Sequence, residues 1–332
     1  MITIQTYHTI NPGAWQSLLD RAPTASFFQS SACYHFYTTL KFIEPFVFAV
    51  SQDDQLVGLA CGYLIADGGA VKRFFSRRAI IPGGLLLDEN ISEEALSGLL
   101  LKIKHTLSSK AIYIEIRNYN DYSSFRDSIS KTGFEYQPHW NIQVSTPDVE
   151  TAFNKISTSK KRQVKQTEKA GVVCEASSNL ADLKAFYQIL QNLYQTRVKK
   201  PLFPLSFFEE LLKQDFSRFF VVKKADQVLG GIVCVQSEKA VYEWFICGVD
   251  HDAERIFPSV LATWKAIEYA AENGFAYFDF MGAGKPGEPY GVRAFKTKFG
   301  GELPEQGRFL YLCKPNLYHF SKITLQIIRK IL

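Results

Sequence analysis

The chain has 332 residues, a net charge of +5 and the composition of an ordinary globular protein, and a chain of about this length usually forms two domains. No stretch reaches the roughly 18 consecutive apolar residues of a membrane span, and the first residues lack the basic and apolar regions of a signal peptide, so we expect a cytoplasmic protein. Six cysteines are scattered without Cys-x-x-Cys or metal-ligand spacing, which argues against a metal site or a disulfide framework.

The first predicted elements form a hairpin. Residues 46–50 read as a strand, residues 54–58 as its polar turn and residues 59–61 as the returning strand. A helix over residues 92–107 and a strand over residues 113–116 follow.

Between the hairpin and the helix, cations flank an apolar strand that ends at Ile-Pro-Gly-Gly, residues 81–84. They are Lys72, Arg73, Arg77 and Arg78. Four cations near such a turn are candidates for binding a diphosphate in the first domain. An exposed edge strand protected by charge is the alternative.

The turn-forming cluster Ser-Thr-Pro-Asp at residues 145–148 predicts a boundary between domains of residues 1–147 and 148–332. Net charge differs across it, at −2 over residues 1–148 and +7 over the remainder. The second domain is therefore the expected place for an anionic ligand.

A basic helix is predicted over residues 153–170. It contains Lys160, Lys161 and Arg162 among its cations and has Glu168 as its one acid. The segment is either a cationic wall facing phosphates, with Arg162 as a substrate-binding candidate, or an ordinary solvated helix face.

The elements of the first half then recur. Residues 219–222 and 226–234 read as a second hairpin, followed by a helix over residues 259–273 and a strand over residues 277–280. The same order at nearly the same spacing predicts two copies of one unit. The alternative is two unrelated segments that share common dipeptides. Because hairpins alternate with helices in both halves, we predict an α/β fold of the α+β type with mixed sheets.

The second copy ends in a strand and a glycine-rich loop. Asp279 lies at the end of that strand, although Asp is disfavoured inside strands. Gly282, Gly284 and Gly287 spell G-x-G-x-x-G, but Pro286 removes a backbone donor and no βαβ unit opens here. We therefore expect a mobile loop that covers substrate rather than a dinucleotide site.

Four motifs carry a resemblance to a known family. They are Phe-Phe-Gln-Ser at residues 27–30, Ser-Lys-Lys-Arg-Gln at 159–163, Tyr-Phe-Asp-Phe-Met-Gly at 277–282 and Phe-Lys-Thr-Lys-Phe-Gly-Gly at 295–301. Together they resemble the Fem family of non-ribosomal peptidyl transferases, which are linked to peptidoglycan interpeptide bridges and methicillin resistance. The resemblance implies two tandem domains of the Gcn5-related (GNAT) acyltransferase fold, aminoacyl-tRNA as donor and Lys296 as the essential lysine.

The acyl donor stays open at this point. The chain has no long helical-hairpin insertion for tRNA between Phe153 and Phe219, and no Arg/Gln-x-x-Gly-x-Gly/Ala loop for coenzyme A. We expect aminoacyl-tRNA or acyl-CoA as a co-substrate and no permanently bound cofactor.

Acyl transfer to an amine requires no enzyme nucleophile, and the sequence offers no persuasive Ser-His-Asp or Cys-His set. Lys296 is the candidate for stabilising the oxyanion or binding a phosphate. Asp279 is the candidate for accepting the amine proton or orienting Lys296, with a structural role in capping a turn as the alternative. Further candidates for binding the precursor or the donor are Tyr290, Arg293 and Lys298. Lys296 and Lys298 can alternatively belong to a solvated face.

The leading hypothesis is a cytoplasmic acyl or aminoacyl transferase that acts on an amine of a UDP-linked or lipid-linked cell-envelope precursor. One alternative is an acetyl-CoA-dependent N-acyltransferase acting on a nucleotide sugar for polysaccharide synthesis. Another is a non-catalytic RNA-binding protein. No DNA partner is expected, and the basic, amphipathic residues 316–332 allow at most peripheral membrane contact, with packing on their own domain as the alternative.

Overall fold

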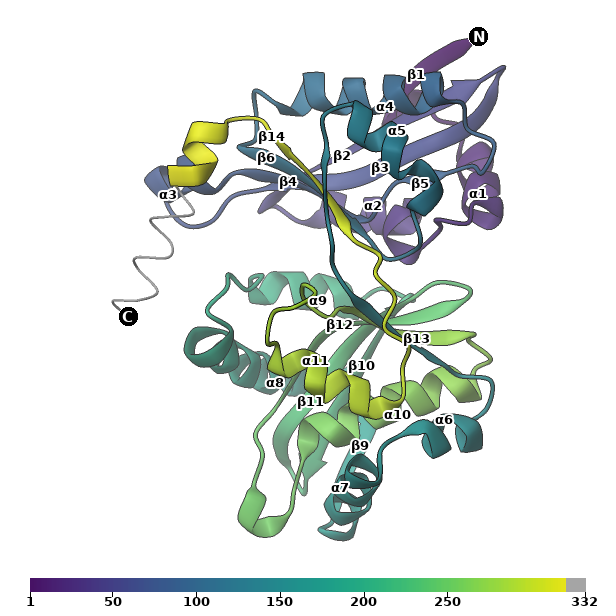
Figure 1. Cartoon of the computed structure of the whole chain (residues 1–332). Helices are drawn as coiled ribbons and strands as arrows, with labels where there is room; N and C mark the ends of the chain where they lie inside the picture. The colour runs from purple at the N-terminus through teal and green to yellow at the C-terminus, as the bar shows by residue number, and fades with distance from the viewer. Residues whose placement is uncertain (321–332) are drawn as a thin grey trace. The chain divides into compact units, whose positions relative to one another are not determined.

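The computed structural model describes residues 1–320, apart from the side chains of residues 70–72 and of Asp252. The chain divides into two compact units (Figure 1): unit 1 comprises Met1–His139 and Glu305–Leu332, and unit 2 comprises Trp140–Pro304. Each unit has a mixed sheet of its own. Most of the predicted C-terminal amphipathic segment, from residue 321 onward, lies outside the described residues.

Unit 1 is built on a sheet with the order β1-β2-β3-β4-β6-β14-β7, in which β5 also pairs with β3. Its strands are β1 (Ile2–Thr6), β2 (Ile43–Gln52), β3 (Gln55–Ile65), β4 (Arg78–Gly83), β5 (Leu86–Leu87), β6 (Tyr113–Asn118), β7 (Glu135–Gln137) and β14 (Arg308–Leu312). Its α-helices are α1 (Pro12–Arg21), α2 (Ser31–Thr39), α3 (Ala70–Ser76), α4 (Glu93–Leu107) and α5 (Arg126–Lys131), with short 3₁₀ turns η1 (Tyr7–Thr9), η2 (Phe27–Gln29) and η3 (Ser123–Phe125).

Unit 2 is built on a sheet with the order β8-β13-β12-β11-β10-β9. Its strands are β8 (Asn141–Ser145), β9 (Val172–Ala176), β10 (Ser217–Lys224), β11 (Gln227–Gln236), β12 (Ala240–Gly248) and β13 (Tyr277–Gly282). Its helices are α6 (Val149–Lys155), α7 (Thr158–Lys169), α8 (Leu180–Leu193), the π-helical turn η4 (Tyr194–Val198), α9 (Leu205–Leu212), the 3₁₀ turn η5 (Asp252–Glu254), α10 (Pro258–Glu272), α11 (Gly291–Lys296) and the 3₁₀ turn η6 (Thr297–Phe299).

The predicted repeat and the mixed sheets are confirmed. The hairpin β2–β3 in unit 1 corresponds to β10–β11 in unit 2, and both pair antiparallel. Each unit then has one parallel pair, β4–β6 or β12–β13, joined by a connection that contains helix α4 or α10. Such parallel pairs require a crossover, which explains why each hairpin is followed by a helix and another strand.

The crossover helix α10 forms because its sequence supports both its start and its packing. Pro258 stands at the first helical position, where no backbone N–H is needed. Ala262, Ala266 and Ala270 then recur at four-residue intervals and are fully buried. Small side chains on one face let the helix lie close against the sheet.

The observed units differ from the predicted domains of residues 1–147 and 148–332 in two places. Strand β8 belongs to unit 2, where it pairs antiparallel with β13. Strand β14 returns to unit 1, where it lies between β6 and β7 and Phe309 enters the core. Local turn signals at residues 145–148 do not reveal this exchange, because strand pairing across more than a hundred residues leaves no local pattern.

The Phe-Phe-Gln-Ser motif has a structural role in unit 1. Phe27, Phe28 and Gln29 are all buried. The Gln29 side-chain amide donates hydrogen bonds to the Thr24 and Gly83 carbonyls at 3.0 and 2.9 Å. The Gly83 carbonyl terminates β4, so this motif fixes the end of that strand.

We expect Phe309→Ala to destabilise unit 1 by about 3–5 kcal/mol, because it leaves a cavity in a core where the Phe309 side chain is fully buried. Hydrogen exchange read by peptide should show lost protection in β6 and β7, with β12 and β13 unchanged. Phe278→Ala, at an equally buried position of β13, is the matched control and should give the reverse pattern. Loss of protection in β13 on changing Phe309 would contradict this assignment of β14.

Candidate functional site

The candidate site lies where strands β12 and β13 part. They pair at Ala240 with Tyr277, Val241 with Phe278 and Tyr242 with Asp279, and their pairing ends there. The remaining parts of the two strands line a cavity of about 850 Å³ in unit 2. Beyond its paired part, β12 also has a register shift against β11, opposite Val233 and Cys234. A bulge of this kind increases local twist and helps to separate neighbouring strands.

Lys296 is buried in this gap, at the end of α11, and only 7% of its surface is exposed. Its Nζ donates to the Phe280 carbonyl at 2.6 Å and approaches the Gly282 carbonyl at 3.4 Å. The same atom lies 3.1 Å from Glu243 Oε1. The ammonium therefore contacts both of the separated strands, β13 through two backbone carbonyls and β12 through the carboxylate of Glu243.

Glu243 is the functional candidate that sequence reasoning missed. It lies on β12, lines the cavity and is 5% exposed. Its Oε1 pairs with Lys296, whereas its Oε2 is buried without a hydrogen-bond partner. Burial raises the pKa of Glu243, and the Lys296 ammonium partly offsets that rise. A carboxylate of this kind is a suitable proton acceptor for a reaction inside the cavity.

Asp279 is fully buried and does not line the cavity. Its Oδ1 accepts a hydrogen bond from the Met281 N–H at 2.5 Å, and its Oδ2 accepts one from Gln143 Nε2 at 3.0 Å. Met281 has a positive φ of 58°, which residues other than glycine rarely adopt. Asp279 thus fixes the backbone of Met281, where the pairing of β13 with β8 is irregular. Burial raises its pKa to about 6 despite these hydrogen bonds.

Arg293 shapes the glycine-rich loop that follows β13. Its Nε donates to the Ala283 carbonyl at 2.9 Å, and its Nη2 donates to the carbonyls of Lys285 and Glu288 at 2.8 and 2.9 Å. The guanidinium also lies 4.6 Å from the Trp140 ring centroid. These contacts fold the loop and engage Nε and Nη2 of the guanidinium that was predicted to bind a ligand.

Tyr290 was predicted to bind the precursor or the donor, and it lines the cavity, as Lys296 does. Its ring packs over Gly284, where φ is 84° and an added Cβ would approach the ring to 2.9 Å. Glycine is therefore required at this position for two independent reasons. Arg162 and Lys298 are exposed and do not line the cavity.

The four cations predicted to bind a diphosphate lie in unit 1. Arg77 pairs with Glu44 at 2.5 Å, and Arg78 pairs with Asp67 at 2.9 Å. Arg73 is exposed on α3, and the side chain of Lys72 lies outside the described part of the chain. Two of the four cations therefore already have carboxylate partners within their own unit.

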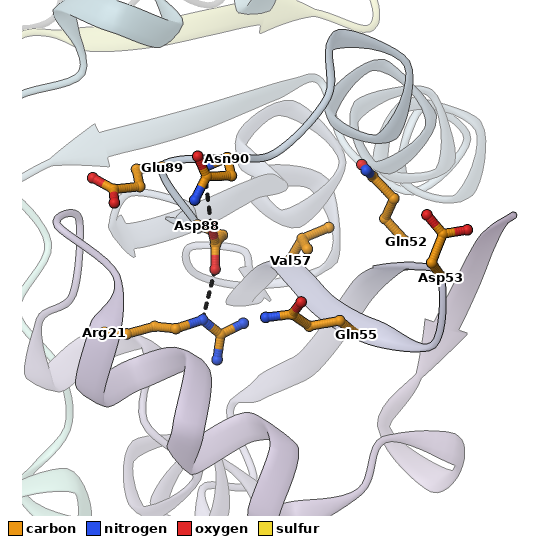
Figure 2. A pocket seen from close by; sticks show the side chains of 8 residues that line it. All are labelled: Arg21, Gln52, Asp53, Gln55, Val57, Asp88, Glu89 and Asn90. Atoms are coloured by element: carbon orange, nitrogen blue, oxygen red, sulfur yellow. Dashed lines mark hydrogen bonds and ion pairs between the residues drawn. The ribbon is translucent and has the colours of Figure 1, made fainter.

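Unit 1 has a smaller pocket, of about 310 Å³, which Figure 2 shows. Arg21 crosses it and donates to Asp88 Oδ2 at 2.6 Å. Burial opposes ionisation of Asp88, but hydrogen bonds from Asn90 and Arg21 lower its pKa below the usual value. Because the one cation of the lining is engaged in this pair and other lining residues include Asp53 and Glu89, the pocket offers little to an anionic ligand.

Residues 154–296 match the family model described as an acetyltransferase (GNAT) domain. No curated protein matches the chain. The structure of FemX superposes with a TM-score of 0.71 at 17% identity, covering 96% of this chain and 99% of that chain.

Two further structures cover most of both chains. A tandem GNAT protein from the clavulanic acid biosynthesis pathway gives a TM-score of 0.59 at 10% identity, covering 94% of this chain and 99% of that one. The C-terminal domain of a putative lysylphosphatidylglycerol synthetase from Agrobacterium fabrum gives 0.56 at 14% identity, covering 89% and 91%. At such low identity these similarities establish the fold.

The family match shows an acetyltransferase (GNAT) type of domain over residues 154–296, and the structural similarities show a fold of two tandem GNAT-type domains, the second of which carries the cavity. The fold resembles that of FemX, as the sequence motifs predict. No helix among the described residues is long and apolar enough to cross a membrane.

We expect Lys296→Met to destabilise the protein by about 3–5 kcal/mol, because Glu243 is then buried without its counter-ion. Adding Glu243→Gln should recover much of that loss, since a neutral amide needs no counter-ion. Urea unfolding of the two single variants and the double variant measures this coupling. Equal stability of Lys296→Met and the double variant would show that the ion pair does not contribute.

The raised pKa of Asp279 predicts a pH dependence of stability. Because the folded pKa is about 6, against an ordinary value of 3.8, the folded protein holds this proton more tightly than the unfolded chain. The resulting stabilisation is complete below about pH 4 and is lost as the pH rises through 6.

The free energy of unfolding of the wild type, relative to Asp279→Asn, should therefore fall between about pH 4 and 6. Urea titrations across this range measure the difference, and exposed Asp226→Asn serves as the control. A constant difference between wild type and Asp279→Asn over the range would be inconsistent with the raised pKa.

Proposed function

We propose that the protein forms an amide bond by transferring an acyl or aminoacyl group to an amine of a peptidoglycan precursor or another cell-envelope precursor. The observation that carries the proposal is the buried Glu243 carboxylate, which lines a cavity in the domain that matches the acetyltransferase family and whose Oε2 has no hydrogen-bond partner among the described residues. The FemX fold and the lysylphosphatidylglycerol synthetase named among the similar structures support an envelope-related acceptor, which is either UDP-linked or lipid-linked.

The reaction needs a proton acceptor but no covalent enzyme intermediate. The amine nitrogen attacks the acyl carbon of an ester or thioester, a C–N bond forms, and the bond from that carbon to the donor oxygen or sulfur breaks. Glu243 Oε2 takes the proton that the nitrogen loses. The same proton can then pass to the leaving oxygen or sulfur, which returns Glu243 to its carboxylate form.

Lys296 has two parts in this mechanism. Through Oε1 it orients Glu243, and it stabilises the negative charge that Glu243 carries before the proton arrives. The longest of its polar contacts is the one of 3.4 Å to the Gly282 carbonyl. The N–H of that contact is the one that can turn toward a developing oxyanion. Asp279 is a positioning residue in this scheme, because it fixes the backbone of Met281 within β13 and does not line the cavity.

A second candidate is an acetyl-CoA-dependent N-acyltransferase that acts on a nucleotide sugar. The description of the matching family as an acetyltransferase domain favours it. The two candidates share the proposed chemistry at Glu243 and differ in both substrates. Measuring transfer from acetyl-CoA and from aminoacyl-tRNA, each to UDP-muramyl pentapeptide and to amino-sugar nucleotides, distinguishes them.

With whichever pair supports transfer, Glu243→Gln should lower kcat about 10²- to 10⁴-fold, because the amide cannot accept the amine proton. The KM for the donor should stay within a few-fold of the wild-type value. Glu268→Gln, which removes the carboxylate that pairs with Lys265 on α10, is the matched control and should keep wild-type kinetics. A wild-type kcat in Glu243→Gln would remove Glu243 from the mechanism.

A further inference from the structure

One cation at the cavity is buried against aromatic rings. Lys160 lies in the first turn of α7, is 8% exposed and lines the cavity. Among the described residues no ion pair includes Lys160, although Asp250, which also lines the cavity, attracts its ammonium. The ammonium instead faces aromatic rings, with Nζ 4.3 Å from the Phe295 centroid and 5.9 Å from that of Phe299.

Burying an ammonium without a carboxylate is costly, and ring contacts repay only part of that cost. Burial and the nearby Lys298 ammonium lower the pKa of Lys160 to about 8, although Asp250 acts in the opposite direction. The group therefore remains mostly protonated at pH 7. The folded chain therefore keeps a positive charge at this wall that Asp250 attracts but with which no described carboxylate forms an ion pair.

Gln163 provides a second unpartnered group on the same wall. It follows Lys160 by three residues on α7, so both side chains lie on one helix face, and both line the cavity. Its Oε1 is buried without a hydrogen-bond partner among the described residues. A ligand that satisfies both side chains presents an anionic group with a hydroxyl or N–H beside it.

The positive end of α10 adds to the field at this cavity. Ser259 and Val260, in the first turn of that helix, line it. The helix comes close to β12, because an added Cβ on Gly248 would lie 2.7 Å from the Ser259 nitrogen. Helix N-termini favour negative charge. No glycine lies between residues 249 and 259, so a glycine-rich turn is not available here to bind phosphate through its backbone.

We propose that Lys160 and Gln163 form a phosphate-binding subsite, in which Lys160 contacts a phosphate of the acyl donor and Gln163 accepts a hydrogen bond from an adjacent hydroxyl. This inference rests on the proposed acyl transfer. Phosphate beside hydroxyl occurs both in coenzyme A and at the 3′ end of a tRNA, so the two donor classes share the chemistry that the subsite recognises.

The test measures binding by the full chain, using calorimetry at fixed ionic strength. The probes are inorganic pyrophosphate, coenzyme A and an RNA oligonucleotide ending in CCA. We expect Lys160→Met to bind the preferred probe about ten- to a hundredfold more weakly than the wild type, because a hydrogen bond to a charged group is lost. Lys165→Met is the matched control, since Lys165 lies on the exposed part of the same helix, and it should bind as the wild type does.

Two readouts separate ligand binding from a structural role. Removal of a buried, unpaired charge should raise the Tm of ligand-free Lys160→Met. Wild-type affinity should fall as the pH rises through about 8, where Lys160 loses its proton, and this fall should be absent in Lys160→Arg. Tighter binding of coenzyme A or of the oligonucleotide identifies the donor class.

Wild-type affinity of Lys160→Met for every probe, or no binding of any probe by the wild type, would overturn the inference. The proposed function is tested separately. If the wild type binds a probe through Lys160 but transfers no acyl group, the proposed subsite stands and the proposed reaction is wrong. If Lys160→Met transfers the acyl group with an unchanged donor KM, the proposed reaction stands and the proposed subsite is wrong.

Discussion

The early end of pairing between β12 and β13 is the constraint on which the candidate site depends. Beyond Tyr242 and Asp279 the two strands no longer form a ladder, so backbone carbonyls of β13 need other partners. The Lys296 ammonium supplies them at Phe280 and Gly282. Charge that enters the gap in this way needs a counter-ion, and Glu243 provides it from the opposite strand. The separation of the strands, the buried lysine and the buried carboxylate therefore depend on one another.

The two units use the same topology and differ at this point. In unit 1 the corresponding strands β4 and β6 stay paired from Ala79 with Ile114 to Gly83 with Asn118. Side chains from elsewhere in the unit reinforce the end of that ladder, including Gln29 and Tyr122, which both donate to the Gly83 carbonyl. A closed ladder satisfies its own backbone groups and requires no buried ion pair. The proposed chemistry therefore belongs to unit 2, whose central strands β12 and β13 separate.

Local sequence patterns predicted the elements and part of the site. Alternating residues and polar turns indicated both hairpins, and their recurrence indicated the repeat. Lys296 was predicted from its motif, but its buried position follows from contacts with two other strands. Glu243 was missed because Tyr242 and Trp244 beside it make its segment resemble an ordinary buried strand. The available signal was an acid inside a strand, which is the feature that singled out Asp279.

Charge alone was a weaker guide, because a cation in sequence gives no information about its partner in space. Arg77, Arg78 and Arg293 were predicted to bind a ligand, yet carboxylates or backbone carbonyls of the folded chain contact each of them. Lys160 was named among the cations of the basic helix but not singled out as a binding residue, and in the structure it is buried against an aromatic ring without a carboxylate in an ion pair. The ring contacts within the chain offset only part of the free-energy cost of burying such a residue. A buried charge outside any ion pair therefore argues for an external ligand more strongly than any number of paired cations on the surface.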